Sequence, residues 1–345
     1  MLGPALEVRG GVSSLERMIV PTGNQEFSIE MLPTMHDNSY FGRFNHWLAR
    51  LATWPIRSVF NRPDIVHIHF SHGLSTFRKL ILLRLWKLSG CRVILHAHSS
   101  DYAEKFPRRP RPMRWLISRF VCKADLLIVL SESWQEFYSS ALGYDSNRIR
   151  IMKTPVEIPE GVPSIDSDKP IVLFSGRVGE RKGTFSLIEA WNALPKHLTM
   201  SAELVITGDG DVDRARRFAR TSGHGSNISV LGWVSDETLS RYLMDCVIYV
   251  LPSKNEGMPM GLIEAMAHSK AVISTPVGGI PELISHRHNG LLVNPGSVEE
   301  LRGALEELLV DEELRASISA EARRSVEPLD FVTYMNNMRS IWSEA

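Results

Sequence analysis

The chain has very little cysteine, with only Cys91, Cys122 and Cys246 in 345 residues. Their odd number and wide separation provide neither a disulfide framework nor the spacing of metal ligands, which favours a reducing cytoplasm. No stretch reaches the ~20 consecutive apolar residues that a membrane-spanning helix requires. No basic segment followed by an apolar one opens the chain. These absences predict a cytoplasmic protein that is soluble or peripheral on the inner face of a membrane.

The chain also lacks a net charge, because 39 Lys and Arg residues balance 39 Asp and Glu residues. The two halves differ, however. Residues 1–163 contain 21 basic and 14 acidic residues, and residues 164–345 contain 18 and 25. The basic first half indicates an anionic partner on that side. The length fits two domains, and the hydrophobic share of 43% is ordinary for globular proteins.

The segment Lys105–Lys123 concentrates the basic charge of the first half. It contains seven basic residues and no acidic one, with Phe106, Trp115 and Phe120 between them. Basic groups beside aromatic rings suit an anionic lipid surface, and they also suit a diphosphate-linked acceptor. A solvated loop followed by a core-packing helix explains the same pattern. No nucleic-acid recognition motif accompanies the charge, so we expect no nucleic-acid partner.

The most informative stretch is 251–267, which reads as the end of a buried strand, a glycine-containing turn and a helix. Free N–H groups and the helix dipole favour an anion such as phosphate at a helix start. Glu256 in the turn and Glu264 in the helix would repel phosphate, so hydroxyl groups are their natural partners. A phosphate flanked by hydroxyl-binding carboxylates describes a nucleotide sugar. A solvated loop with two incidental glutamates explains the spacing alone equally well.

The sequence Asn-Glu256-Gly-Met-Pro-Met-Gly-Leu-Ile-Glu264-Ala-Met-Ala resembles the signature of the retaining glycosyltransferases of family four, which have the GT-B architecture. The resemblance assigns Glu256 to the hydroxyls of the donor sugar and Glu264 to the ribose. It assigns the rest of this stretch to donor binding through Gly257, Met260, Gly261 and Leu262.

Three further segments of the second half match the same family. Arg177 and Lys182 lie in a glycine-containing loop after a strand, where they could clamp a diphosphate. A solvated loop is the alternative. The resemblance implies that both cations neutralise the donor diphosphate during departure of the nucleotide. It also implies donor contacts at Gly208, in a turn that follows a strand, and at Val234, beside the base.

The first half contains weaker signals. Gly10 and Gly11 precede a helix and read equally as a plain turn, whereas the family places such a pair at the donor phosphates. His98 ends a strand, where ligands of α/β proteins bind. It could also be a hydrogen-bonded structural histidine, but the resemblance places it beside the reacting carbon of the sugar. Asp101 follows as a candidate for acceptor contact. Few residues precede Gly10, so we expect either that the first strand is short or missing or that the true start of the chain lies upstream.

The histidines at 67, 69 and 72 raise the possibility of a metal site. His67 and His69 share one face of a strand, and no neighbouring cysteine or carboxylate completes a ligand set. The resembled family needs no metal for its chemistry. We therefore expect no metal and no cofactor, and we expect the nucleoside diphosphate sugar to act as a co-substrate.

Strands alternate with helices throughout, which predicts an α/β protein. With the resemblance, we expect the GT-B fold: two Rossmann-like domains, each a doubly wound parallel sheet, facing a central cleft. The expected domains are 1–163 on the acceptor side, with a truncated first strand, and 164–325 on the nucleotide-sugar side. We expect 326–345 to form a helix that returns to the first domain.

The expected function is a retaining, metal-independent hexosyltransferase. It would use a donor such as a UDP- or GDP-sugar and a carbohydrate or lipid-linked acceptor in cell-surface polysaccharide or glycolipid synthesis. A nucleotide-sugar epimerase of similar fold is one alternative, but it requires additional acid–base groups that the sequence does not identify. A catalytically idle binder of sugar nucleotides is the other alternative, suggested by the short first strand.

Overall fold

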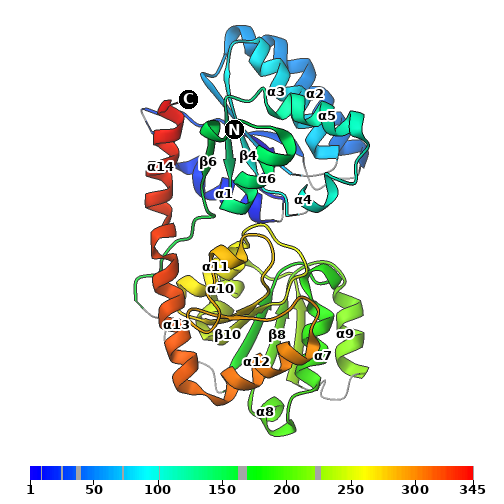
Figure 1. The fold of residues 1–345 in the computed structure, drawn as a ribbon, viewed down its shortest axis with the longest axis vertical. Coiled ribbons are helices and arrows are strands. Elements are labelled where there is room, and N and C mark those ends of the chain that lie inside the picture. Colours follow the sequence, from blue (N-terminus) through cyan, green and yellow to red (C-terminus); the bar gives the residue numbers. More distant parts are fainter. Residues whose placement is uncertain are drawn as a thin grey trace. The chain divides into compact units, whose positions relative to one another are not determined.

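The computed structural model describes residues 1–8, 10–24, 26–35, 40–71, 74–100, 102–161, 169–221 and 227–344. The chain forms two compact units (Figure 1). Unit 1 comprises Met1–Thr154 and Val332–Ala345, and unit 2 comprises Pro155–Phe331. The sequence analysis placed the boundary at 163, but the segment after Thr154 already belongs to unit 2. The reason is that Val156 exchanges backbone hydrogen bonds of 3.0 and 2.9 Å with Leu329 and Phe331.

Unit 1 is built on one parallel six-stranded sheet with the strand order β2-β1-β3-β4-β5-β6. The first strand, β1, has three residues and pairs with both β2 and β3. The elements of this unit are β1 Leu2–Pro4, α1 Gly11–Ile19, β2 Leu32–Met35, α2 Tyr40–Phe60, β3 Ile65–Phe70, α3 Leu74–Leu88, β4 Arg92–Ala97, α4 Tyr102–Lys105, α5 Arg111–Val121, β5 Leu126–Val129, α6 Glu132–Leu142, β6 Ile149–Ile151 and α14 Phe331–Glu344.

The alternation of side chains along β3 separates two environments in unit 1. Val66, Ile68 and Phe70 belong to the apolar core, which also contains side chains of α3, α5 and α6. His67 and His69 point to the opposite face, because successive residues of a strand face opposite sides. On that face they meet residues of α1 and α14. One face of this sheet is therefore apolar, and the other carries a row of buried imidazoles.

Unit 2 contains a second parallel six-stranded sheet, in the order β12-β11-β10-β7-β8-β9. Its elements are β7 Ile171–Ser175, α7 Thr184–Asn192, α8 Lys196–Ser201, β8 Glu203–Thr207, α9 Val212–Thr221, β9 Ile228–Gly232, α10 Asp236–Asp245, β10 Cys246–Leu251, α11 Met260–Ala267, β11 Ala271–Ser274, β12 Leu291–Leu292, α12 Val298–Val310 and α13 Glu312–Val326. The predicted pair of doubly wound parallel sheets is thus confirmed.

The strand order of each sheet reverses direction once, between β1 and β3 in unit 1 and between β7 and β10 in unit 2. At such a switch point the loops leaving the two strands diverge to opposite faces and open a crevice at the carboxyl ends of the strands. In unit 2 these are the loops 176–183 and 252–259, which contain the predicted site residues Arg177, Lys182, Glu256 and Gly257.

Candidate functional site

The switch point of unit 2 is bridged by one ion pair between its two loops. Lys182 Nζ, from the loop after β7, donates to Glu256 Oε1, from the loop after β10, over 2.5 Å. Ser253 Oγ donates to the same oxygen over 2.7 Å. The side chains of Lys182 and Glu256 are only 16% and 7% exposed. The structure therefore brings together two predicted site residues that lie 74 positions apart in the chain.

Ser253 is a site residue that sequence reasoning missed. Its side chain is fully buried, and its backbone carbonyl accepts a 2.5 Å hydrogen bond from Thr275 Oγ1 of the strand-end region beside it. This anchoring holds the loop so that Glu256 turns toward Lys182. The available signal was the position of Ser253 directly after the buried strand β10, where polar side chains of α/β proteins commonly line a site.

The second predicted carboxylate, Glu264, lies on α11 and is half-buried. Burial raises the pKa of its carboxyl, and the negative charges of Asp236 and Glu157 raise it further. A carboxyl in this setting is well placed to bind neutral hydroxyl groups rather than anions. This environment fits the predicted ribose contact in chemistry.

Helix α11 begins at Met260, and no side chain caps its N-terminus. The first amides of a helix have no partner within the helix, so they are available to an anion. Of the predicted donor contacts in this region, Gly257 and Leu262 are buried, whereas Met260 and Gly261 are half-buried. A β-carbon on Gly261 would lie 2.6 Å from the hydroxyl of Tyr249, which explains why the second residue of α11 is a glycine.

Arg177 and Val234 are placed separately from the ion pair. Arg177 follows β7, is exposed, and makes no hydrogen bond or ion pair within the described residues. Val234 follows β9 and is half-buried. Gly208 directly follows β8 with φ +133°, and a β-carbon there would lie 1.8 Å from the carbonyl oxygen of Gly176. This close approach of the two turns requires glycine at position 208.

In unit 1, the predicted donor contacts Gly10 and Gly11 are exposed at the start of α1. Gly10 is the N-cap residue with φ +142°, and its carbonyl accepts from the amide of Ser14 over 3.0 Å. The pair therefore starts a helix, as the sequence indicated. Asp101, the candidate for acceptor contact, lies outside the described residues, as does His72.

His98 follows β4 and is half-buried. Its Nε2 lies 2.8 Å from Nδ1 of His69, so the two rings share a hydrogen bond. Burial and, to a smaller extent, the nearby charge of Lys79 lower the pKa of His98 to about 3. His98 is thus a neutral imidazole, and its predicted contact with the donor sugar would be made through a hydrogen bond rather than a charge.

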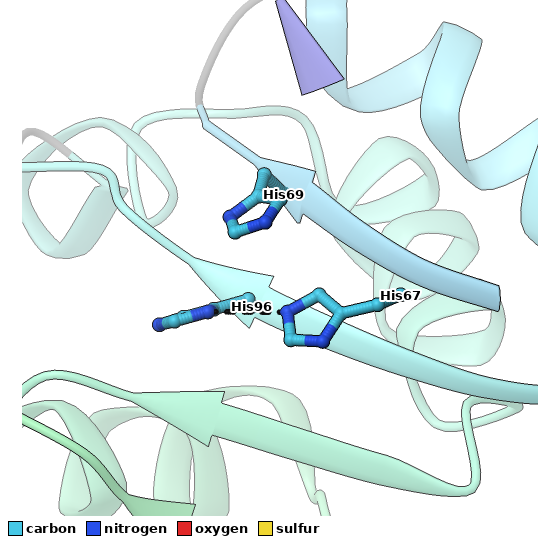
Figure 2. Close-up of side chains that lie close together, drawn as sticks. All are labelled: His67, His69 and His96. Carbon is cyan, nitrogen blue, oxygen red and sulfur yellow. Dashed lines mark hydrogen bonds between the residues drawn. The ribbon is translucent and has the colours of Figure 1, made fainter. Parts of the chain in front are cut away.

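The rings of His67, His69 and His96 gather on one face of the sheet, where each offers a nitrogen within 4.8 Å of the others (Figure 2). This geometry alone resembles a three-histidine metal site. The sequence analysis had considered His72 in place of His96. The strands β3 and β4 instead pair His67 and His69 with the neighbouring positions Ile94 and His96.

The hydrogen bonds of His67 argue against a metal at this cluster. The indole N–H of Trp342 can only donate, and it donates to Nδ1 of His67 over 3.2 Å. The proton of the neutral His67 ring must then lie on Nε2, which donates to Nδ1 of His96 over 3.2 Å. A nitrogen that carries a proton has no lone pair for a metal ion. Within this cluster His67 and His96 are joined by a hydrogen bond, whereas His69 bonds to His98 instead.

Comparison with known families and proteins places these features in context. A model of glycosyltransferase family 4 matches residues 17–159, and a model of the glycosyl transferases group 1 matches residues 159–325. Together they cover both units.

Three relatives illustrate the sequence similarity. The sulfoquinovosyl transferase SQD2 of Arabidopsis thaliana is 27% identical over 299 residues, which cover 81% of this chain and 56% of that protein. The putative teichuronic acid biosynthesis glycosyltransferase TuaC of Bacillus subtilis (strain 168) is 28% identical, with 74% and 64% covered. The amylovoran biosynthesis glycosyltransferase AmsK of Erwinia amylovora is 28% identical, with 84% and 72% covered. The chain therefore spans less than two thirds of the length of the first two relatives.

Two solved structures show the similarity of fold. Anabaena Alr3699/HepE in complex with UDP matches with a TM-score of 0.79 at 16% identity, covering 100% of this chain and 99% of that one. The apo form of the lipopolysaccharide outer core galactosyltransferase WaaB matches with a TM-score of 0.72 at 20% identity, with the same coverage. At these identities the match concerns the arrangement of the chain rather than its chemistry.

Proposed function

Because this chain belongs to the group 1 glycosyltransferases of family 4 and has their GT-B fold, we propose that it transfers a hexose from a nucleoside diphosphate sugar to an acceptor hydroxyl with retention of configuration. The observation that supports the proposal most directly is the buried Lys182–Glu256 pair at the switch point of unit 2. In this proposal the cation of the pair would bind the diphosphate, and the carboxylate would bind the sugar hydroxyls.

Catalysis would be mainly electrostatic. Negative charge develops on the diphosphate as the bond to the sugar breaks, so Lys182, Arg177 and the first amides of α11 would stabilise the transition state. Each charge-assisted hydrogen bond of this kind contributes about 1.5–3 kcal/mol. Attack and departure on the same face of the sugar require no enzyme nucleophile. We therefore propose that retention is achieved without a covalent intermediate and without a metal.

The remaining side chains would orient the donor. In this proposal Glu256 binds hydroxyls of the hexose, Glu264 binds the ribose, and Val234 lies beside the base. His98 would direct a hydrogen bond to the donor near the reacting carbon. Gly10, Gly11 and Gly208 would let the backbone approach the donor closely.

A donor panel tests the proposal. We would measure nucleotide release from UDP-, GDP- and ADP-sugars, because such an enzyme should slowly hydrolyse its own donor without acceptor. Release from one donor, lost in Glu256→Ala, supports the transferase and names the nucleotide. The matched control is Glu313→Ala, an exposed glutamate of α13. Donor binding without release, from a folded protein, would instead favour the idle binder.

Two further measurements address stereochemistry and metal use. The anomeric proton of the product, followed by NMR from the start of the reaction, should keep the configuration of the donor. An inverted product would contradict retention. Turnover should also persist in excess EDTA, and a loss of turnover that is restored by a divalent cation would contradict metal independence.

For the acceptor we propose a carbohydrate or a lipid-linked sugar. The names of the relatives, which refer to teichuronic acid, amylovoran and a sulfoquinovosyl group, support such a product class. A lipid-linked acceptor would bring the protein to the cytoplasmic face of a membrane. Within the residues that the structure describes, no helix has the length and apolar character needed to span a bilayer.

An anionic membrane surface is the second partner that we propose, through Lys105–Lys123 and the helices beside it. Helix α3 packs between α2 and α5 (Figure 1). The sequences of these three helices contain ten basic residues and no acidic one. They also expose large apolar side chains, including Phe60 at 84% and Trp115 at 61%. Exposed aromatic groups among cations suit the headgroup region of anionic lipids.

Vesicle co-sedimentation tests this surface. We expect binding to vesicles that contain phosphatidylglycerol but not to pure phosphatidylcholine, and weaker binding as salt rises. Trp115→Ser combined with Arg119→Glu should reduce binding. The matched control on unit 2 is Met200→Ser combined with Arg217→Glu, two exposed positions. Equal binding of both double variants would reject the surface.

A further inference from the structure

Two buried polar groups face each other behind His98 and have no other partner. Both carboxyl oxygens of Glu16, on α1, are buried without a hydrogen bond within the described residues. The same is true of Nε2 of His69, on β3. Glu16 Oε1 and His69 Nε2 lie 3.9 Å apart, and both side chains are 0% exposed. Because buried polar groups in native proteins are almost always satisfied, a small shift that joins this pair is the simplest way to satisfy both.

The packing holds the Glu16 carboxyl at this point. A β-carbon on Gly3 would lie 1.6 Å from Glu16 Oε1, so the absence of a side chain in β1 makes room for the carboxyl. Lys79, the cation whose charge acts most strongly on this carboxyl, does not pair with it, because Lys79 Nζ donates instead to the backbone carbonyl of His69. The carboxyl is therefore directed at an imidazole rather than at an ammonium group.

The other ring nitrogen of His69 continues the series. His69 Nδ1 shares a 2.8 Å hydrogen bond with Nε2 of His98. Glu16, His69 and His98 thus lie in sequence, with each ring nitrogen of His69 assigned to one neighbour. The Nδ1 of His98 makes no hydrogen bond within the part of the chain that the structure describes, which leaves it as the outward end of the series.

We propose that Glu16 and His69 form a proton relay behind His98, in which the protonation state of the Glu16 carboxyl determines which ring nitrogen of His98 carries the proton. Glu16 and His69 are positioning residues in this arrangement. The consequence for glycosyl transfer rests on the proposed function, because only there does His98 contact the donor.

The protons of the two states can be counted. With Glu16 protonated, its O–H donates to His69 Nε2, His69 Nδ1–H donates to His98 Nε2, and His98 presents Nδ1–H. With Glu16 ionised, His69 carries its proton on Nε2 and His98 carries its proton on Nε2, so His98 presents an unprotonated Nδ1. One proton separates the states. When Glu16 loses its proton to the relay, the proton on Nδ1 of His98 leaves. The proton on His69 Nδ1 moves to His98 Nε2, and the proton on Glu16 moves to His69 Nε2.

The electrostatics of unit 1 place this change near neutral pH. Burial raises the pKa of Glu16 to about 8, against the lowering effect of Lys79 on α3 and of the Met1 amino group just before β1. Burial lowers the pKa of His69 well below its usual value, and His67, His98, His96 and Lys79 lower it further. The imidazoles therefore stay neutral, and the carboxyl is the group that titrates.

For a donor sugar the two states are chemically different. A presented Nδ1–H can donate to an oxygen of the phosphate or the sugar, whereas an unprotonated Nδ1 can only accept from a hydroxyl. If the reaction needs a donor at this position, activity should fall about tenfold per pH unit above the pKa of Glu16.

NMR of the full chain with ¹⁵N-labelled histidine tests the relay without any substrate. The ¹⁵N shifts and two-bond couplings of His98 report its tautomer between pH 6 and 9.5. We expect wild type to change from Nδ1–H to Nε2–H across this range. Glu16→Gln should hold Nδ1–H throughout, because its amide N–H replaces the carboxyl O–H. Glu26→Gln, at an exposed position of the same unit, should behave as wild type.

The outcomes separate the relay from the proposed function. A His98 tautomer that does not change with pH in wild type, or that changes equally in folded Glu16→Gln, overturns the relay. If Glu16→Gln does not fold, a comparison of wild type with His69→Asn still tests the relay. The His69→Asn substitution should abolish the pH-dependent change of the His98 tautomer. Absence of nucleotide release from every donor would reject the proposed function and leave the tautomer measurement intact.

Discussion

The two sheets hold their buried polar groups in different ways. In unit 2, Lys182, Glu256 and Ser253 satisfy one another at the switch point with distances of 2.5 and 2.7 Å. In unit 1, Glu16 and His69 face each other at 3.9 Å without a hydrogen bond, and the protein keeps them neutral. Burial beside a partner satisfies both groups, whereas burial without a partner favours the neutral form of each. The first arrangement suits binding of an anion, and the second suits transfer of a proton.

The largest effect should come from breaking the pair in unit 2. Glu256→Ala removes the proposed contact to the sugar hydroxyls and leaves Lys182 half-buried without its carboxylate. We expect nucleotide release to fall about 10²–10³-fold in kcat/KM, the usual loss for one transition-state contact. Steady-state assays against the exposed-site control Glu313→Ala measure it. A loss below tenfold would show that Glu256 is not a central donor contact.

The unpaired carboxyl in unit 1 should appear in the pH dependence of stability. Between the ordinary pKa of 4.5 and the folded value of about 8, folded Glu16 keeps a proton that the unfolded chain releases. Stability therefore declines as pH rises through this window, by up to about 1.4 kcal/mol per pH unit, and levels off above it. Glu16→Gln lacks this decline.

Urea denaturation of both proteins at pH 5, 7 and 8.5 provides the measurement. The buried histidines act in the opposite sense, because His67 and His98 have pKa values lowered to about 3 and stay neutral when folded. Their contribution rises with pH up to their ordinary values near 6.5 and is common to wild type and variant. A constant difference between the two proteins would contradict a raised pKa at Glu16.

Alanine substitutions at two glycines compare a tightly packed position with an open position on a helix. Gly261→Ala would bring a β-carbon within 2.6 Å of the Tyr249 hydroxyl, which is fixed by donation to the carbonyl of Ser175. We expect a loss of about 1–3 kcal/mol in the free energy of unfolding. Gly303→Ala, in α12 with open space around it, should gain about 0.5–1 kcal/mol. Changes of the same sign would show that the start of α11 is not tightly packed.

The smallest effect should follow from removing the indole N–H that donates to His67. Trp342→Phe keeps the ring that packs against Phe27 at 5.5 Å but deletes the N–H that donates to His67. We expect a loss of about 1 kcal/mol, because a buried acceptor is left unsatisfied. Thermal unfolding beside Trp233→Phe, which changes an exposed tryptophan, measures it. If the two substitutions cost the same, the tautomer assigned to His67 loses its support.

Much of the fold could be predicted from local pattern. Apolar β-branched runs such as Val247–Leu251 are typical of buried parallel strands, and the alternation with helices then indicates doubly wound sheets. The domain boundary was harder to predict from the sequence. Two backbone hydrogen bonds of Val156 to the region near Phe331 draw the segment after Thr154 into unit 2, and contacts so distant in sequence leave no local pattern.

The sequence predicted the position of a candidate residue where one local segment defines it. Glu256 in one loop and His98 at the end of one strand are examples. It was not predictable where two elements meet. Nothing near Glu16 in the sequence indicates that its helix buries it beside His69, and nothing near Ser253 indicates that its hydroxyl donates to Glu256. The members of the three-histidine cluster likewise could not be predicted without the register of β3 and β4. That register brings His96, rather than His72, beside His67 and His69.

The sequence by itself determined the class of fold, which loop follows each strand along the chain, and the residue types available for a nucleotide sugar. Periodicity and short motifs are local properties, so they can be recognised without the tertiary structure. Only the tertiary structure decided which charges are paired and which are neutral. That decision depends on burial and on partners far away in the sequence, as in the hydrogen bond from Trp342 to His67 across 275 positions. The free energy of a buried group is set by its neighbours in space, and these are fixed only when the sheets and helices pack.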